Sequence, residues 1–473
     1  MATISAPGIG SGIDVQSIVK QLVALERAPL TQLKSQAASL QTKVSTYGTI
    51  QSQVSALGEA AAKLSSSGGW NAVLGTSSNP SSVGVTAAAG APATALTMEV
   101  QQLARAQSTA SAAVATGAAV GSGSLTIELG RWSGTGFTAG SGTPLSLTIN
   151  PGEDTLTAIA ATINRADAGV SATVLRDASG ERLLMRSKDT GVENGFRISV
   201  ADADGTHSDA SGLSRLAFAA SNANGMTQTQ ASQNALATIN GVAIASASNR
   251  LSDTLPGLTI QLSQVTTAPV EIDVSADVEA VRANVKAFVD AYNTLNSNLA
   301  NLTRYDAGSK TAGALQGDAS ATGLQSALRG MMRSVSGSTP FSRLADVGIE
   351  LQTGGTLSIK SEKMDAALSN LKGLRELFTI QTGVATTEGF GRKVKTFADG
   401  LLDTDGLISS KTAALQASIN RNGIEQEKVN DRAARAEVRY LAQYNAMDTN
   451  VARLNSLSAF VTQQISLWNK SSG

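Results

Sequence analysis

The sequence predicts an α+β protein of several domains, in which terminal helices form a coiled-coil or helical-bundle leg and mainly-β head domains are inserted between them. Three observations predict this class. Apolar residues recur with heptad spacing near both ends of the chain, and short alternating runs fill the middle. The length of 473 residues is also enough for about three or four domains.

The stretch from Leu30 to Leu64 is the clearest helical pattern. Two apolar positions per seven, on a surface of Gln, Ser, Thr and Lys, make a stripe that is too narrow for a globular core helix. We therefore expect this helix to bury one edge against another helix. The stripe consists of Leu30, Leu33, Ala37, Leu40, Val44, Tyr47, Ile50, Val54, Leu57, Ala61 and Leu64.

A matching stripe runs from Leu415 to Trp468, with polar Asn422 and Gln426 in two of its seam positions. If the two helices pair within one chain, they run antiparallel and everything between them is an insertion. At 1.5 Å per residue the second helix would reach roughly 80 Å and the first roughly 50 Å. The C-terminal helix should therefore extend beyond its mate.

A shorter helix is expected before Pro29, which interrupts it. Asp14 or Ser17 lies near its start. One apolar face is expected to contain Ile13, Ile18, Leu22, Val23 and Leu25.

From about residue 77 the pattern changes to strands bounded by turn-forming residues. A short helix is expected over 155–167, with Leu156, Ile159, Ala160 and Ile163 on one face. Asn240-Gly241 is the strongest hairpin signal, because a two-residue type I′ turn requires positive φ. The polar stretch 201–232 is interpreted as a linker or poorly ordered loop.

Helices return near Asp277. They are expected at about 277–302, 319–334, after Ser361 as a capping residue, at 389–401 and at 409–469. A small hairpin is expected over 349–359.

Composition disfavours several function classes. Net charge is zero, with 37 basic and 37 acidic residues and no basic run, which argues against nucleic acid or an anionic membrane as a partner. No apolar run approaches the roughly 20 residues that span a bilayer, and the N-terminus does not resemble a signal peptide. The absence of cysteine excludes disulfides and thiolate chemistry.

The candidate chemical motifs favour structural interpretations. His207 is the only histidine and lies in a polar loop whose Asp-x-Asp-Gly sequence lacks the spacing of a calcium loop. Gly8-Ile-Gly10 lacks the preceding strand and lysine of a phosphate loop, and Ser17-Ile-Val-Lys20 has no accompanying catalytic motif. We therefore expect no catalytic, cofactor-binding or metal-binding residues, and no enzyme.

Motifs at both ends and in the inner frame resemble the bacterial flagellar filament cap (FliD) family, also called flagellar hook-associated protein 2. The resemblance rests on specific motifs at the ends and in the inner frame, whereas 111–230 matches the family only in its general pattern of residue types. It rests on Gly10-Ser-Gly-Ile-Asp14-Val, Ile18-Val-Lys-Gln-Leu22, Glu26-Arg-Ala-Pro29-Leu, Thr238-Ile-Asn-Gly241, Pro256-Gly-Leu-Thr-Ile260, Gly355-Thr-Leu-Ser-Ile359, Met364-Asp-Ala-Ala-Leu368, Asp405-Gly-Leu-Ile408 and Thr462-Gln-Gln-Ile465.

The resemblance implies a secreted structural protein at the tip of the bacterial flagellum. Such a protein forms a homo-oligomeric ring and promotes insertion and folding of exported flagellin subunits. Its expected partners are flagellin, other hook-associated proteins, the flagellar type III export apparatus and an export chaperone, with no cofactor, nucleic acid or membrane.

The resemblance also suggests a division of the chain. It places a terminal arm at 1–42 plus 432–473, a helical leg at 43–76 plus 275–431, an inner β head at 77–110 plus 231–274 and an outer β-rich head at 111–230. The expected oligomerisation and partner-binding residues are in the arm: Ile13, Ile18, Leu22, Leu25, Val461, Ile465 and Trp468.

Two other interpretations stay open at this point. The β head could bind host glycans, which would make the protein a surface adhesin on a helical stalk and add cell adhesion to motility. Alternatively, paired terminal helices also suit a flagellin or a hook–filament junction protein.

Overall fold

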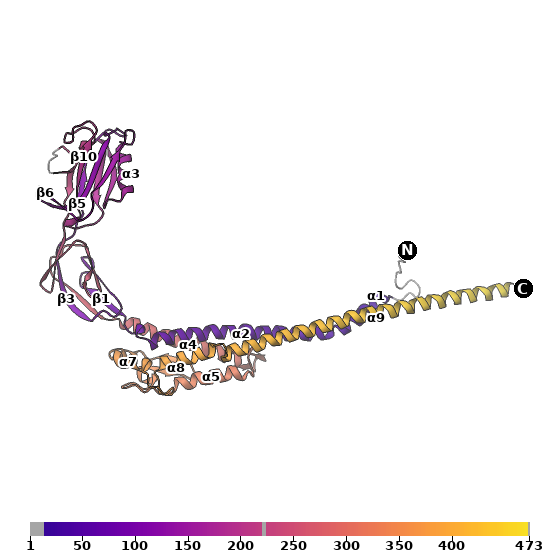
Figure 1. The fold of residues 1–473 in the computed structure, drawn as a ribbon. Coiled ribbons are helices and arrows are strands. Elements are labelled where there is room, and N and C mark those ends of the chain that lie inside the picture. The colour runs from indigo at the N-terminus through magenta and orange to yellow at the C-terminus, as the bar shows by residue number, and fades with distance from the viewer. Residues whose placement is uncertain (1–13, 220–223, 472–473) are drawn as a thin grey trace. The chain divides into compact units, whose positions relative to one another are not determined.

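The computed structural model describes residues 14–219 and 224–471 and divides the chain into two compact units (Figure 1). One unit contains the residues up to Trp70 together with those from Val281 onward, and the other is Asn71–Ala280. The first is mainly helical and the second mainly β, so the predicted fold class is confirmed. The four-part division of the chain stays a prediction.

Within the described residues, the helical unit contains two very long helices, six shorter ones and small elements between them (Figure 1). Its helices are α1 (Val15–Glu26), α2 (Ala28–Ser65), α4 (Val278–Thr303), α5 (Ala319–Met332), α6 (Ser361–Leu368), α7 (Leu371–Thr379), α8 (Phe390–Leu402) and α9 (Leu407–Ser471), with 3₁₀ turns η1 (Ser67–Gly69) and η4 (Leu344–Val347). Its strand pairs are β17 (Tyr305–Asp306) with β18 (Thr311–Ala312), and β19 (Ile349–Leu351) with β20 (Leu357–Ile359).

Local chemistry explains where α1 and α2 begin. The Asp14 side chain accepts the Ser17 N–H at 2.9 Å and caps α1. The break between the helices lies at Arg27, and Pro29 lies in the first turn of α2, where the missing N–H would have no helical partner. Pro29 therefore favours the start of a new helix at Ala28, directly after the break.

The predicted Ser361 cap is wrong. Ser361 is the first residue of α6, and the residue at the cap position, Lys360, makes no side-chain cap hydrogen bond. The helix also ends at Leu368. Asn370 then starts α7, because its side chain accepts the Gly373 N–H at 3.1 Å.

The core of the helical unit gathers the apolar faces of α2 and of α4 to α9. Aromatic rings lie at its centre: Phe378 contacts Trp70 at 5.7 Å and Phe288 at 6.0 Å between ring centroids. The Trp70 indole N–H donates to the Leu64 carbonyl at 2.8 Å, so the chain leaves α2 in one fixed direction. The seam predicted on Leu30–Leu64 is fully buried only from Tyr47 onward.

The β unit consists of antiparallel sheets. The first pair is a five-stranded sheet in the order β1 (Val73–Ser77), β16 (Val270–Ala276), β3 (Thr94–Gln102), β12 (Ala235–Ile239) and β13 (Val242–Ser246), and a three-stranded sheet in the order β14 (Arg250–Leu255), β15 (Leu258–Leu262) and β2 (Val83–Ala87). One apolar cluster draws on both sheets. Asn240 and Gly241 have positive φ and close the hairpin with Ile239 opposite Val242, as predicted.

The second pair of sheets encloses another apolar cluster with α3 (Leu156–Ala166). One sheet has the order β10 (Gly195–Asp202), β5 (Gly123–Ser133) and β6 (Gly136–Ala139), with β7 (Leu145–Ile149) also on β5; the other has β11 (Thr227–Gln230), β4 (Ser108–Ala110), β9 (Gly180–Ser187) and β8 (Val170–Asp177). All four residues predicted on the inner face of α3 are buried.

The linker interpretation of 201–232 is wrong for the part that the structure describes. Leu213 and Leu216 of η3 (Leu213–Leu216) are fully buried, and β11 pairs with β4. The buried Asp202 carboxylate accepts the Ser214 N–H at 2.8 Å and fastens this segment to β10. The polar composition of this segment led to the wrong prediction, because hydrogen bonds from side chains to the main chain hold the loop in place.

Two glycines of α2 provide a matched stability test. A Cβ at Gly48 would meet nothing within 4 Å, whereas one at Gly58 would lie 3.0 Å from Ala398 Cβ. Gly48→Ala should stabilise the helical unit by about 0.5–1 kcal/mol. Gly58→Ala should destabilise it, because overpacking of about 1–3 kcal/mol outweighs the helix-propensity gain. Urea unfolding followed by circular dichroism measures both, and equal effects would contradict the packing described here.

Candidate functional site

The terminal helices pair in an antiparallel register that stays constant over several turns. Three contacts define it: Tyr47 with Lys411, Gln36 with Asn422, and Glu26 with Arg432. Between the first and second contacts both helices advance eleven residues, and between the second and third both advance ten. The predicted antiparallel pairing is therefore confirmed (Figure 1).

A partly buried charge cluster fastens the inner end of this pair. Asp318 caps α5 by accepting the Ser320 N–H at 2.9 Å, and its carboxylate lies 3.0 Å from the Lys411 Nζ. Burial opposes ionisation of Asp318, but hydrogen bonding and the charge of Lys411 outweigh it and hold the pKa of Asp318 below its usual value. Burial, with the neighbouring Asp318 carboxylate, raises the pKa of Tyr47. Helices α2, α5 and α9 are thus tied at one point.

The short helix α1 packs on α9 through valines. Val15, Val19 and Val23, four residues apart, are buried against Ala433, Tyr440, Leu441 and Tyr444. The apolar sequence of α1 offers more than one face. Ile18 and Leu22 follow the same four-residue spacing as the valines, so no signal in the sequence alone identifies the buried face.

The predicted arm residues of α1 lie beside this contact. Ile18 and Leu22 are half-buried and Leu25 is 71% exposed, while Ile13 falls outside the described residues. None of the three described residues belongs to the buried cluster between α1 and α9. Of these, Leu25 is accessible and Ile18 and Leu22 are only partly so, and the role of all three in binding stays a prediction.

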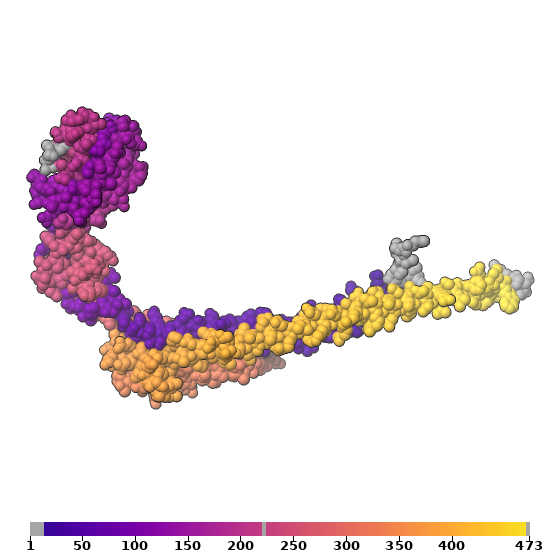
Figure 2. All heavy atoms as spheres, in the orientation of Figure 1, coloured from indigo at the N-terminus to yellow at the C-terminus, as the bar shows by residue number. Residues whose placement is uncertain are grey.

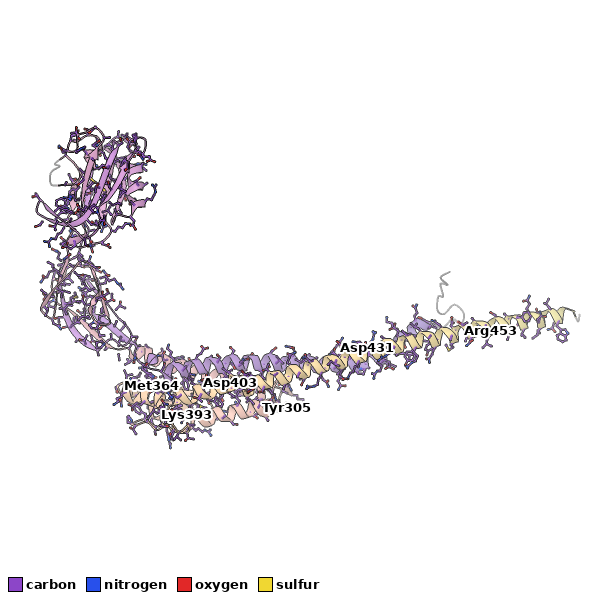
Figure 3. The ribbon with its side chains drawn as sticks, in the orientation of Figure 1. Tyr305, Met364, Lys393, Asp403, Asp431 and Arg453 are labelled. Carbon is purple, nitrogen blue, oxygen red and sulfur yellow. The ribbon has the colours of Figure 1, made fainter. Side chains whose placement is uncertain are left out.

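Beyond Tyr444, α9 continues without a described helix beside it, and in Figure 2 its yellow end projects past the packed helices. Every described side chain from 453 to 469 is exposed. Arg453 lies on this segment and Asp431 on the paired part of α9, whereas Met364, Lys393 and Asp403 lie within the helical bundle (Figure 3). The exposed large apolar residues are Leu454, Leu457, Phe460, Val461, Ile465, Leu467 and Trp468.

The exposed apolar residues form a stripe. At 100° per residue, Leu454, Leu457, Val461, Ile465 and Trp468 share one face of the helix. Their exposed fractions range from 47% at Val461 to 75% at Trp468. Contiguous exposed apolar stripes of this kind are typical of interaction surfaces. Three of the predicted site residues, Val461, Ile465 and Trp468, belong to it.

Of the remaining candidates, the Gly8-Ile-Gly10 motif lies outside the described residues, and the others show no organised chemistry. His207 Nδ1 accepts the Asp202 N–H at 3.0 Å, and the fully buried Ser214 hydroxyl donates to the Thr206 carbonyl at 2.6 Å, so both fasten a loop. Between α5 and α8 an open hollow of about 700 Å³ contains Lys393, whose ammonium donates to the Val335 carbonyl at 2.6 Å. In the described parts of the chain no cluster of three or more His, Cys, Asp or Glu residues suits a metal ion.

The structure bears on membrane spanning in one respect, the length and apolar character of its helices. Among the helices within 14–219 and 224–471, none is long and apolar enough to cross a lipid bilayer.

Comparison with known proteins identifies relatives along the whole chain. Residues 11–107 match the family described as "Flagellar hook-associated protein 2 N-terminus", and 232–456 match its C-terminus. Flagellar hook-associated protein 2 of Escherichia coli K12 is 32% identical over 98% of both chains. The B-type flagellar hook-associated protein 2 of Pseudomonas aeruginosa is 30% identical, also over 98% of both chains.

A solved structure shows the same similarity. The D1-D2-D3 domains of the flagellar cap protein FliD from Escherichia coli cover 78% of this chain and 99% of that one, with 31% identity and a TM-score of 0.60. The adhesin alternative finds no support among these relatives. Their names also favour hook-associated protein 2 over a flagellin or a junction protein.

The Asp318 cluster predicts a pH dependence. Because the folded-state pKa of Asp318 is lowered, its stabilising contribution is present above the unfolded-state pKa near 4 and is lost as pH falls through the folded value. Asp318→Asn should destabilise the helical unit by about 1.5–3 kcal/mol at neutral pH, and the difference from wild type should shrink towards pH 3.

Thermal melts at neutral pH and near pH 3 test this dependence. Asp405→Asn is the matched control, because it makes the same charge change at an exposed carboxylate just before α9. It should have little effect at either pH. A wild-type to Asp318→Asn difference that is equally large at both pH values would contradict the proposed contribution of the ionised carboxylate.

Proposed function

Because the chain belongs to the flagellar hook-associated protein 2 family, we propose that it is the structural cap at the distal end of the bacterial flagellar filament. The proposal draws on relatives that align over 98% of this chain and on a flagellar cap protein of known structure. The site of action is extracellular, at the tip of the flagellum. No bond-making or bond-breaking chemistry is needed for this role.

The mechanism that we propose is mechanical. Copies of the chain associate into a ring over the filament end, and their terminal arms contact flagellin. Each newly exported flagellin subunit then folds and inserts at the position that the ring leaves open. The export apparatus of the flagellar type III pathway, an export chaperone and other hook-associated proteins complete the proposed set of partners.

The observation that carries the proposal is the exposed apolar stripe of α9. Covering one side chain of the size of leucine contributes about 1.5–3 kcal/mol, so several such contacts provide a strong driving force for association. A helix whose apolar stripe is exposed in the single chain is suited to pairing with helices of other subunits. We assign Ile13, Ile18, Leu22, Leu25, Val461, Ile465 and Trp468 to this arm contact.

We propose that the chain works as four parts. The arm is 1–42 plus 432–473, the leg is 43–76 plus 275–431, and the inner and outer heads are 77–110 plus 231–274 and 111–230. The buried apolar residues support this division, because they form separate clusters in the arm, among the leg helices and in each pair of sheets. Separate cores allow the arm to change its contacts while the other parts stay folded.

The arm stripe can be tested by placing charges on it. Val461→Asp with Ile465→Asp should abolish filament growth in a strain that lacks the native protein and release unassembled flagellin into the medium, because charges oppose burial of the stripe. The same assay should show loss of capping after deletion of residues 1–20 or 460–473. Circular dichroism should show that the remainder of the protein is still folded.

The matched control is Ala459→Asp with Gln463→Asp, which adds the same charges four residues apart on the opposite face of α9. This variant should support filament growth. If the stripe variant also assembles filaments at the wild-type rate, the stripe is not the contact surface.

A further inference from the structure

The pair formed by α9 with α1 and α2 contains two separate apolar clusters. The first belongs to the core of the helical bundle and ends at Leu40 and Val44 on α2 and Leu415 on α9. The second begins at Val23 on α1 and Ala433 on α9. Between them, no residue of α2 from 28 to 46 is buried, and Asn422 is the only buried residue of α9 from 416 to 432.

A polar contact interrupts the seam in this interval, where the apolar residues Leu33, Ala37 and Ile419 are only half-buried. Asn422 is 8% exposed; its side-chain N–H donates to Gln36 Oε1 at 3.5 Å, and its Oδ1 accepts the Gln426 Nε2–H at 2.7 Å. The first of these bonds is at the upper limit of hydrogen-bond length. Such bonds offset the desolvation of the amides but add little net stability, whereas a leucine at the same position would add apolar burial.

Other features of the interval also contribute little to the stability of the helix pair. Gly423 follows Asn422 inside α9, and glycine lowers helix stability relative to alanine. The ion pair between Glu26 and Arg432 spans 3.3 Å, but both side chains are partly exposed, so it contributes little. Local opening free energies follow the burial of apolar contacts, and no apolar residue of this interval is fully buried.

We propose that the Gln36–Asn422–Gln426 layer divides the helix pair into two cooperative units. The inner unit, up to Leu40 and Leu415, unfolds only with the helical bundle. The outer unit, α1 with α9 beyond Ala433, opens and closes by itself. The layer acts as a stop, so that opening of the outer unit does not propagate into the bundle. This property belongs to the isolated chain and does not depend on the capping function.

Hydrogen exchange of the full-length protein, followed by mass spectrometry of its peptides, tests the proposal. Amides of α9 at 407–415 should exchange at least tenfold more slowly than those at 433–444, with a step inside 416–432. Helix α2, which pairs with α9 here, should show the corresponding step in exchange rate between Leu30 and Val44. Simple end fraying instead gives a gradual change along α9, and such a gradient, or equal protection on both sides, would overturn the proposal.

Substitution of the layer provides the second measurement. Asn422→Leu should join the two clusters and slow exchange at 433–444 by at least tenfold, towards the rate of the inner unit. Asn430→Leu is the matched control, since it is the same substitution at an exposed position of the same interval, and it should leave the step unchanged. Unchanged arm exchange in folded Asn422→Leu would overturn the proposal. If that variant misfolds, the wild-type step alone decides.

Discussion

The antiparallel contact between α2 and α9 constrains the rest of the helical unit. Because Tyr47 faces Lys411 and Glu26 faces Arg432, the chain must leave this pair and return to it at the same end. The helices from α4 to α8 then pack on the part of this pair that contributes to the apolar core, around Trp70, Phe288 and Phe378. Because the register is constant and α9 is longer than the helices that pair with it, its C-terminal part extends beyond their described residues.

Burial changes stepwise along α9, and the chemistry changes with it. At the inner end a partly buried charge cluster is tied into the bundle through Asp318. A polar layer at Asn422 follows, then a small valine cluster, and finally a fully exposed stripe. Since apolar burial supplies most of the stability of a helix pair, this order places the firm part inside and the adaptable part outside. This stepwise order suits the proposed contact of the arm with other subunits.

Local patterns predicted the elements well where a single apolar face exists. Helix α3 shows all four expected inner residues, and Asn240-Gly241 forms the expected turn. Patterns were insufficient on α1, because valine, isoleucine and leucine cover more than one of its faces and only the partner selects one of them. Composition also failed at 201–232, where hydrogen bonds to Asp202 order a segment whose residue types are typical of loops.

The amino-acid sequence by itself determined the two heptad stripes, their antiparallel pairing and the resemblance to flagellar cap proteins, because period and motif order are properties of the chain alone. Only the tertiary structure decided which stripe residues are buried, since burial depends on where the partner helix ends. It also brought Tyr47, Asp318 and Lys411 together from three distant segments. No local pattern carries that information, because each residue's environment is supplied by elements that are far away in the sequence.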